Sequence, residues 1–351
     1  MNRRQIIATS SAAGAIALGG AGAWWYLRED GDPKGASNRM DLLAGAYAGS
    51  PHETDHEAFA MLNLTGGMPG RTGMELRLYD LDAAPLSAPE DLSATLTNLV
   101  TGESATDLQL EAQDDGSWQV KQETLESDGW WQLVLTWADL TAYWTFMLPD
   151  PNLTGFGTPP TVDADPDATA MLVSAVSTLT NRTSLRWWEW LSGGNGSIVL
   201  ARFSVTTEAS NGLPDAFESD SMLAGRIPQD GTPPSFREEN TRTVSTSEGA
   251  MRSINEGTPE ATNVIQYLPI AQYDSTYANN DGAHFGTTAE IGGRECQLIA
   301  FHLPGAAEAW FAFWIDIETL FIRELFMHSV NHYMHWIYYD FDEPFELSID
   351  A

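Results

Sequence analysis

Apolar and polar residues alternate with a period of two along most of the first half of the chain. This alternation is typical of half-buried β-strands, and the runs that show it best are 74–78, 92–96, 108–110, 118–120, 130–137 and 143–148. Turn signals such as Asp114-Asp115-Gly116 and Asp128-Gly129 separate the runs. Roughly seven or eight strands at this spacing predict an antiparallel β-sandwich over residues 40–155.

The pattern changes in the second half, after a predicted linker at 156–166. Asp165-Pro166-Asp167 is typical of a helix start, and apolar residues at helical spacing extend this helix to Asn181. Stretch 208–290 is polar and rich in Gly, Pro and Ser, so its strands are left unassigned. One helix followed by an antiparallel meander predicts an α+β domain over 167–351, with β segments at 197–205, 294–301, 309–315, 321–327 and 333–341.

Residues 1–30 are predicted to be a targeting segment rather than part of the folded domains. Arg3 and Arg4 precede an uncharged stretch, 6–27, which carries three aromatic residues at 24–26, just before its end. A twin-arginine export signal and an uncleaved membrane anchor both fit this pattern, because about 22 uncharged residues can span a hydrocarbon core. Either interpretation, with a linker at 31–39, places the rest of the chain at the outer face of the cell membrane or, after cleavage, in the secreted fraction.

Charge narrows the range of partners. The chain carries 49 Asp and Glu against 17 Lys and Arg, a net charge of −32. Such a field repels phosphate backbones, so we expect no nucleic-acid partner, and it suits a high-salt, halophilic environment. Cys296 is the only cysteine, so no internal disulfide supports the fold.

The first domain carries residues that resemble a known family. Pro69-Gly70-Arg71, the run 129–133 (GWWQL) and the exit Pro149-Asp150-Pro151-Asn152 are similar to a YtkA-like, copper-resistance-type immunoglobulin-like domain at about 55–155. The resemblance implies an Ig-like sandwich that lies outside a bacterial membrane beside copper-handling modules. Members often carry methionines in the middle strands, whereas residues 98–107 contain none, so the resemblance concerns the fold more than copper binding.

The second domain, at about 165–351, resembles the LolA/LppX-like lipoprotein carriers. The residues that carry the likeness are the entry 293–296 (GREC), the turn 313–316 (FWID) with Thr319 and Arg323, and the closing 338–341 (YYDF) with Pro344. The resemblance implies a curved sheet, or half-barrel, with a packed helix that holds a lipid. The residues that contact lipid in that family are scattered apolar positions, so none is transferred to this chain.

One motif raises the possibility of zinc. The run from His52 to His56 (HETDH) matches H-E-x-x-H, in which two histidines one helical turn apart bind zinc and Glu53 would activate water. Pro51 and the strand pattern that follows favour a solvated loop instead. Met61 lies close downstream, and thioethers with imidazoles suit copper, although methionine in a strand usually fills a core.

The densest group of metal donors lies near the end of the chain, from Met327 to His335. His328, His332 and Met334 are candidate copper ligands around a predicted turn at 329–331. In an alternating strand His332 and Met334 share one face while His335 points to the other. This geometry favours a structural hairpin, so we expect no cofactor and keep copper as the alternative.

Seven aromatic residues are candidates for the wall of a ligand cavity. They would otherwise form a large aromatic core, and they are Trp187, Trp188, Trp190, Trp310, Phe313, Trp314 and Trp336. The leading hypothesis is a non-enzymatic binding protein that holds a lipid, another hydrophobic ligand or a protein partner in its second domain. Copper handling in the cell envelope is one alternative, and a zinc hydrolase using His52, Glu53 and His56 is the other.

Overall fold

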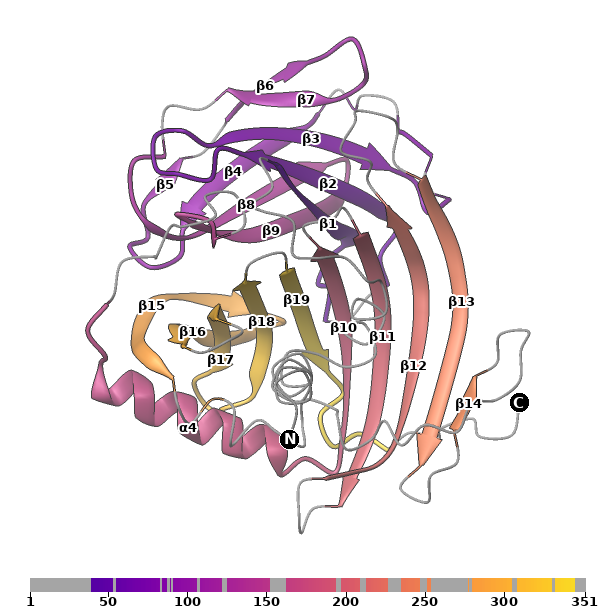
Figure 1. Cartoon of the computed structure of the whole chain (residues 1–351), viewed down its shortest axis with the longest axis vertical. Helices are drawn as coiled ribbons and strands as arrows, with labels where there is room; N and C mark the ends of the chain where they lie inside the picture. The colour runs from indigo at the N-terminus through magenta and orange to yellow at the C-terminus, as the bar shows by residue number, and fades with distance from the viewer. Residues whose placement is uncertain are drawn as a thin grey trace, which may run out of the picture.

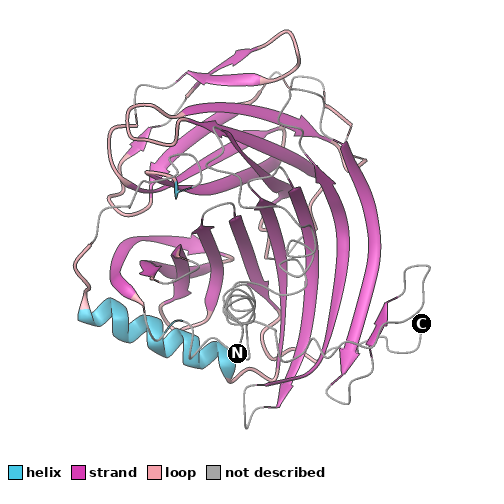
Figure 2. Cartoon of the chain, viewed as in Figure 1, coloured by secondary structure: helices cyan, strands magenta, loops and turns pink. Residues whose placement is uncertain are grey.

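A computed structural model shows a mainly β protein in which two antiparallel sheets pack against each other and one helix covers the second sheet (Figures 1 and 2). It describes residues 39–52, 55–82, 84–86, 89, 91–105, 108–121, 125–151, 162–193, 197–208, 213–226, 235–246, 251–253, 277, 280–304, 308–329 and 332–344. The predicted leader, most of its linker, Glu53 and residues 156–161 of the second linker lie outside this part of the chain.

The first sheet is built from the alternating runs. Its strands lie in the order β5-β4-β8-β9-β1-β2-β3-β7-β6. Their bounds are β1 Arg39–Ala48, β2 Ala58–Thr65, β3 Gly73–Tyr79, β4 Ser93–Asn98, β5 Ser104–Ala105, β6 Gln109–Ala112, β7 Trp118–Lys121, β8 Gly129–Trp137 and β9 Leu140–Leu148.

Strand β1 joins the two halves of this sheet. It pairs with β2 along residues 39–46 and passes to β9 at residues 47–48. The halves share one apolar core, and the indole Nε1 of Trp144 on β9 donates a hydrogen bond to the Leu42 carbonyl on β1 (3.0 Å). The predicted antiparallel sandwich is thus observed, with β1 as the strand common to both layers.

The second sheet is the curved half-barrel visible in Figure 1. Its strands lie in the order β14-β13-β12-β11-β10-β19-β18-β17-β16-β15. Their bounds are β10 Ser184–Gly193, β11 Ser197–Glu208, β12 Leu213–Arg226, β13 Ser235–Thr246, β14 Met251–Ser253, β15 Asp281–Ile291, β16 Arg294–Leu303, β17 Ala309–Asp316, β18 Ile322–Ser329 and β19 His332–Tyr339.

Helix α4 (Pro166–Thr180) covers one face of the second sheet. The Asp165 side chain caps its first turn by accepting hydrogen bonds from the backbone N–H groups of residues 167 and 168, and Asn181 ends it. Its apolar stripe packs on the sheet through Ala168, Leu172, Ala175, Val176 and Leu179. Among the helices that the structure describes, none has the length and apolarity needed to cross a membrane.

The opposite face of the second sheet packs against the first sheet. Strand β17 shows why: its residues 309, 311, 313 and 315 face α4, while residues 310, 312 and 314 face the first sheet. We call this contact layer between the two sheets the seam. It consists of Leu43, Tyr47, Phe59, Met61, Tyr79, Trp188, Trp190, Leu200 and Ile337 in one cluster and Leu99, Trp130, Met147, Cys296, Leu298, Ala300, Trp310, Ala312, Trp314 and Phe326 in another.

Candidate functional site

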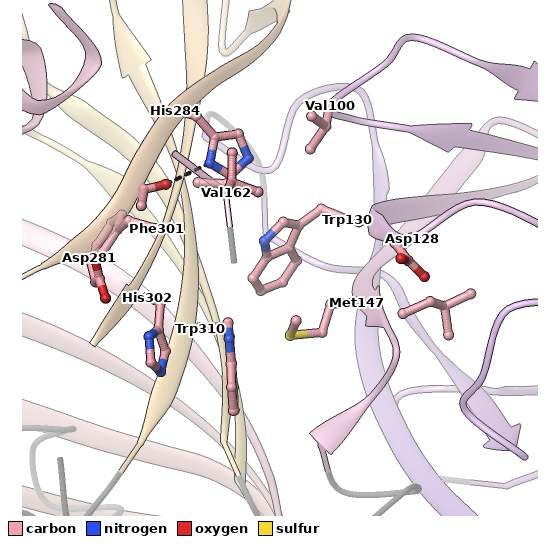
Figure 3. A pocket seen from close by; sticks show the side chains of 14 residues that line it. Val100, Asp128, Trp130, Met147, Val162, Asp281, His284, Phe301, His302 and Trp310 are labelled. Carbon is pink, nitrogen blue, oxygen red and sulfur yellow. Dashed lines mark hydrogen bonds between the residues drawn. The ribbon is translucent and has the colours of Figure 1, made fainter. Parts of the chain in front are cut away.

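A cavity of about 250 Å³ opens at one end of the seam, between the two sheets. The first sheet supplies Trp130, Met147 and neighbouring loop residues, and the second supplies the ends of β15, β16 and β17 (Figure 3). Its wall consists of Val100, Asp128, Gly129, Trp130, Met147, Leu148, Val162, Asp281, Gly282, His284, Ala300, Phe301, His302 and Trp310. The cavity thus exists only where the two sheets meet, and it is lined mainly by apolar side chains.

Two histidines supply polar groups on the second-sheet side. The Nδ1–H of His284 donates to the Gly282 carbonyl (2.7 Å), the dashed contact in Figure 3. His302 stacks on Trp310 with ring centroids 5.0 Å apart and pairs with Glu308 through Nε2 (2.9 Å). The histidines are therefore held by local contacts and can present polar edges beside an apolar surface.

Gly282 allows the segment before α4 to close one side of the cavity. Its φ of +64° lies in the left-handed region, and a Cβ there would come within 2.7 Å of the Val162 carbonyl oxygen. Only glycine meets both conditions without strain. The close approach places Val162 in the cavity wall.

Behind the cavity, Trp130 packs on a buried histidine–carboxylate pair. The ring of His328 meets the Trp130 indole edge to face, with centroids 5.5 Å apart. Its Nδ1 lies 3.1 Å from Oδ2 of Asp150, and its Nε2 lies 3.2 Å from the Thr145 carbonyl oxygen. Both side chains of the pair are fully buried, and the pair links β18 to the end of β9.

A second buried hydrogen-bond network crosses the seam and is centred on another residue of β18. Glu324 of β18 accepts hydrogen bonds from Nε2 of His52 (3.0 Å), the hydroxyl of Tyr143 (2.8 Å) and Nε2 of His335 (3.3 Å). The other ring nitrogen of His52 lies 3.2 Å from the Tyr338 carbonyl oxygen. One carboxylate therefore ties a loop and a strand of the first sheet to two strands of the second.

These contacts determine the charge of the network. Burial by itself would raise the pKa of Glu324, but hydrogen bonds from His335 and His52, together with their charges, lower it to about 2. Burial lowers the pKa of His335 despite the attraction of Glu324. A neutral His335 can still donate its Nε2–H to Glu324.

The H-E-x-x-H interpretation is wrong in its geometry. Residues 51–52 form a turn and 55–57 have no regular structure before β2, so the two histidines do not lie on a helix. His52 turns to Glu324, while His56 packs among aromatic rings that include Phe59 and Trp188. The predicted solvated loop is also wrong in its exposure, because the His52 side chain is only 2% exposed.

The other candidate metal ligands do not converge. Met61 lies in the seam, His328 binds Asp150, and Met334 packs in the core beneath α4. The predicted hairpin is confirmed, with residue 329 paired to His332, whose side chain is outside the described part of the structure. Within the described residues, no group of three or more His, Cys, Asp or Glu side chains is arranged to hold a metal ion.

The seven aromatic candidates divide between the two faces of the second sheet. Trp187, Phe313 and Trp336 lie in the core beneath α4. The seam contains Trp188, Trp190, Trp310 and Trp314. Of the seven, Trp310 lines the cavity.

Several site residues escaped the sequence analysis. The sequence predicts Trp130 and Met147 only as parts of the strands 130–137 and 143–148, because alternation shows that a side chain is buried but not what it contacts. It presents Asp150 only as part of the exit 149–152. Glu324 offered a usable signal, since it is a charged residue inside the apolar strand 322–329, and a buried charge requires partners.

No family model and no curated protein sequence matches the chain. Among solved structures, LprF from Mycobacterium bovis is 10% identical over 52% of this chain and 97% of its own, with a TM-score of 0.39. The lipoprotein LppX from Mycobacterium tuberculosis is 14% identical over 52% of this chain and 99% of its own (TM-score 0.35). A LolA superfamily protein from Nitrosomonas europaea is 9% identical over 52% and 95% (TM-score 0.26).

Each of these alignments covers about half of the chain. The predicted copper-resistance-type family of the first domain finds no support, because no family model matches the chain.

Proposed function

We propose that this chain is an extracytoplasmic, membrane-associated binding protein without catalytic activity, which holds a hydrophobic ligand in the cavity between its two sheets. The observation that carries the proposal is the cavity itself, with Trp130 and Met147 on one wall and Phe301 and Trp310 on the other. The location rests on the leader predicted at residues 1–30.

The size of the cavity limits the ligand. Pockets that enclose drug-sized molecules measure about 300–1,000 Å³, whereas this cavity measures about 250 Å³. It is large enough for a ring or for the end of one acyl chain, and too small for a whole lipid with two chains. We therefore propose a single-chain amphiphile whose apolar end enters the cavity.

The rim supplies a few polar groups that could fix the ligand's orientation. Asp128 and Asp281 add carboxylates to the imidazoles of His284 and His302. Carriers commonly combine an apolar pocket with a small number of such groups. The ligand's polar end would remain at this rim while its apolar end is buried.

Photo-crosslinking tests the proposal directly. The full-length chain, in membranes, is irradiated with a 12-carbon fatty acid that carries a diazirine at its methyl end, and adducts are located by peptide mass spectrometry. We expect adducts on cavity residues such as Trp130, Met147 and Trp310. Adducts that are scattered over the exposed surface would refute the proposal.

A matched pair of variants provides the control. Val100→Phe places a ring in the cavity wall from a half-buried loop position, whereas Val173→Phe adds the same ring to an exposed position on α4. The first substitution should reduce the adduct yield severalfold and the second should leave it unchanged. Equal yields in the two variants would contradict a ligand site at the seam.

A further inference from the structure

Among the residues that the structure describes, four histidines lie beside the seam, and their contacts divide them into two kinds. His52 and His328 each place both ring nitrogens against oxygen atoms that accept hydrogen bonds. His335 has one such contact, to Glu324, and Nδ1 of His56 is buried without a partner. Burial lowers the pKa of His56 to about 4 and also lowers that of His335.

Two oxygen atoms around one imidazole require two protons between them, one at each contact. A neutral imidazole has one N–H donor and one lone pair. Without a second proton, the lone pair of His52 or His328 would face an ionised carboxylate or a carbonyl oxygen at about hydrogen-bond distance, a repulsive contact in a buried site. The geometry therefore calls for one proton in each His–carboxyl contact, on the ring or on the acid, in addition to the proton at the carbonyl contact.

Both pairs connect the same strand to the first sheet. Glu324 and His328 lie on the seam face of β18, four residues apart, and their partners are His52 from the loop after β1 and Asp150 from the end of β9. The cavity lies next to the second pair, because Trp130 contacts His328 and lines the cavity.

We infer that these two pairs form a proton-dependent clasp between the sheets. While each pair keeps the proton of its His–carboxyl contact, the clasp holds β18 against β9 and fixes the Trp130 wall. When the proton is lost at higher pH, the seam beside the cavity loosens and the ligand is released. The last step rests on the proposed function, whereas the clasp itself does not.

Titratable and aromatic groups among the described residues surround both pairs. His328 meets Asp150 after β9, Tyr333 on β19 and Trp130 on β8. The other pair, between His52 and Glu324, is met by Tyr143 and His335, and by the more distant Tyr47, Arg323 and Cys296, whose thiol pKa burial raises to about 12. Burial raises the pKa of each of the three tyrosines, Tyr47, Tyr143 and Tyr333, above its ordinary value. The tyrosines therefore stay neutral over the range in which histidine loses its proton.

Hydrogen exchange of the full-length chain, without added ligand, tests the clasp. Protection of peptides from β9 and β18 is followed from pH 6 to pH 10, after correction for the intrinsic pH dependence of exchange. We expect protection to fall by about tenfold or more as the two pairs lose their protons, since unpaired buried groups are left behind. Protection that stays constant up to pH 10 would overturn the inference.

Variants separate the clasp from other titrations. The double variant D150N/H328Q replaces one charged pair by neutral polar groups of similar size, and H52Q removes the other histidine. Each should reduce the pH dependence, and together they should abolish it. E111Q breaks an exposed ion pair with Lys121 at the edge of the first sheet, away from the seam, and should leave β18 protection unchanged.

One further group titrates in the same range and needs its own control. Burial raises the pKa of Glu189, on the α4 face of β10, to about 8. The exchange series is therefore repeated in the E189Q background, where a persistent pH dependence supports the clasp and its disappearance overturns it.

The fatty-acid adduct yield at pH 6 and pH 10 then tests release. If protection falls as the pH rises but no crosslink forms in the cavity at pH 6, the result supports the clasp and refutes the ligand site. A pH-independent seam with cavity crosslinks would do the reverse.

Discussion

Replacing Glu324 by glutamine should destabilise the protein most at neutral pH and least in acid. The amide side chain keeps the shape of the carboxylate but removes the charge that His52 and His335 face across the seam. Breaking a buried pair by removing one charged partner costs about 3–5 kcal/mol. The substitution should therefore rank among the more damaging single changes in the seam.

The pKa of Glu324 gives an independent estimate of how much this carboxylate stabilises the protein, and it shows in which direction that stabilisation changes with pH. Pairing in the folded state lowers that pKa from an ordinary 4.5 to about 2, despite the opposing effect of burial. The contribution of the carboxylate to stability is complete above the unfolded value of 4.5 and is lost as the pH falls toward 2. A difference of this size corresponds to about 3 kcal/mol, which agrees with the estimate from pair removal.

The assay is urea denaturation of the full-length chain in mild detergent, followed by circular dichroism between pH 2.5 and pH 7. We expect the free energies of unfolding of wild type and Glu324→Gln to differ by about 3 kcal/mol at pH 7 and to converge toward pH 2.5. A gap below about 1 kcal/mol at pH 7, or one that does not change with pH, would refute the assigned pairing. The matched change Glu318→Gln, on an exposed turn, should have little effect.

Three further predictions concern packing and burial. Gly45→Ala places a Cβ 2.6 Å from a ring carbon of Trp190 across the seam, so urea denaturation should show a loss of about 1–3 kcal/mol. Because burial raises the pKa of Glu189 from 4.5 to about 8, wild type should lose stability relative to Glu189→Gln as the pH rises through this range, by up to about 5 kcal/mol at its upper end; parallel stability profiles would contradict the assignment. Leu172→Ala removes a fully buried side chain of α4 and should cost about 2–5 kcal/mol, whereas Val173→Ala on the exposed side should stay within about 0.5 kcal/mol in the same measurement.

Local signals were sufficient for much of the fold. The period-two alternation of residues 73–79 and 129–137 follows from strands with one face in a core and the other less buried, and β3 and β8 were predicted from it. Asp165 and Pro166 mark the start of α4 because capping and a fixed φ act within one turn. These features depend on neighbours in the sequence, so the sequence alone shows them.

Strands buried on both faces were harder to predict. Strand β1 is buried along almost its whole length, and in β10 the tryptophans 187, 188 and 190 face both sides of the sheet. Such strands show no alternation, because both faces need apolar residues. The alternation therefore predicts no strand at 39–48 or 184–193, and it leaves 208–290 unassigned, where β12 to β15 contribute to the second sheet.

The candidate site could not be predicted from the sequence, because it joins distant segments. His52 and Glu324 are 272 positions apart, and Trp130 meets Trp310 across the cavity only because two sheets pack together. Sequence patterns indicate which residues are buried, but they do not show which buried faces meet. The aromatic residues were therefore grouped as one wall, although the second sheet separates them.

Through Tyr333, the packing of the first sheet depends on a residue of the last strand, β19. This residue belongs to β19, yet its side chain lies in the core of the first sheet. A gene fragment that ended after Leu148 would encode nine strands with a gap in their interior and with Trp130 and Met147 turned to water. Such a product would be prone to aggregate, so recombination cannot transfer the first nine strands to another protein without also supplying a substitute for the last hairpin.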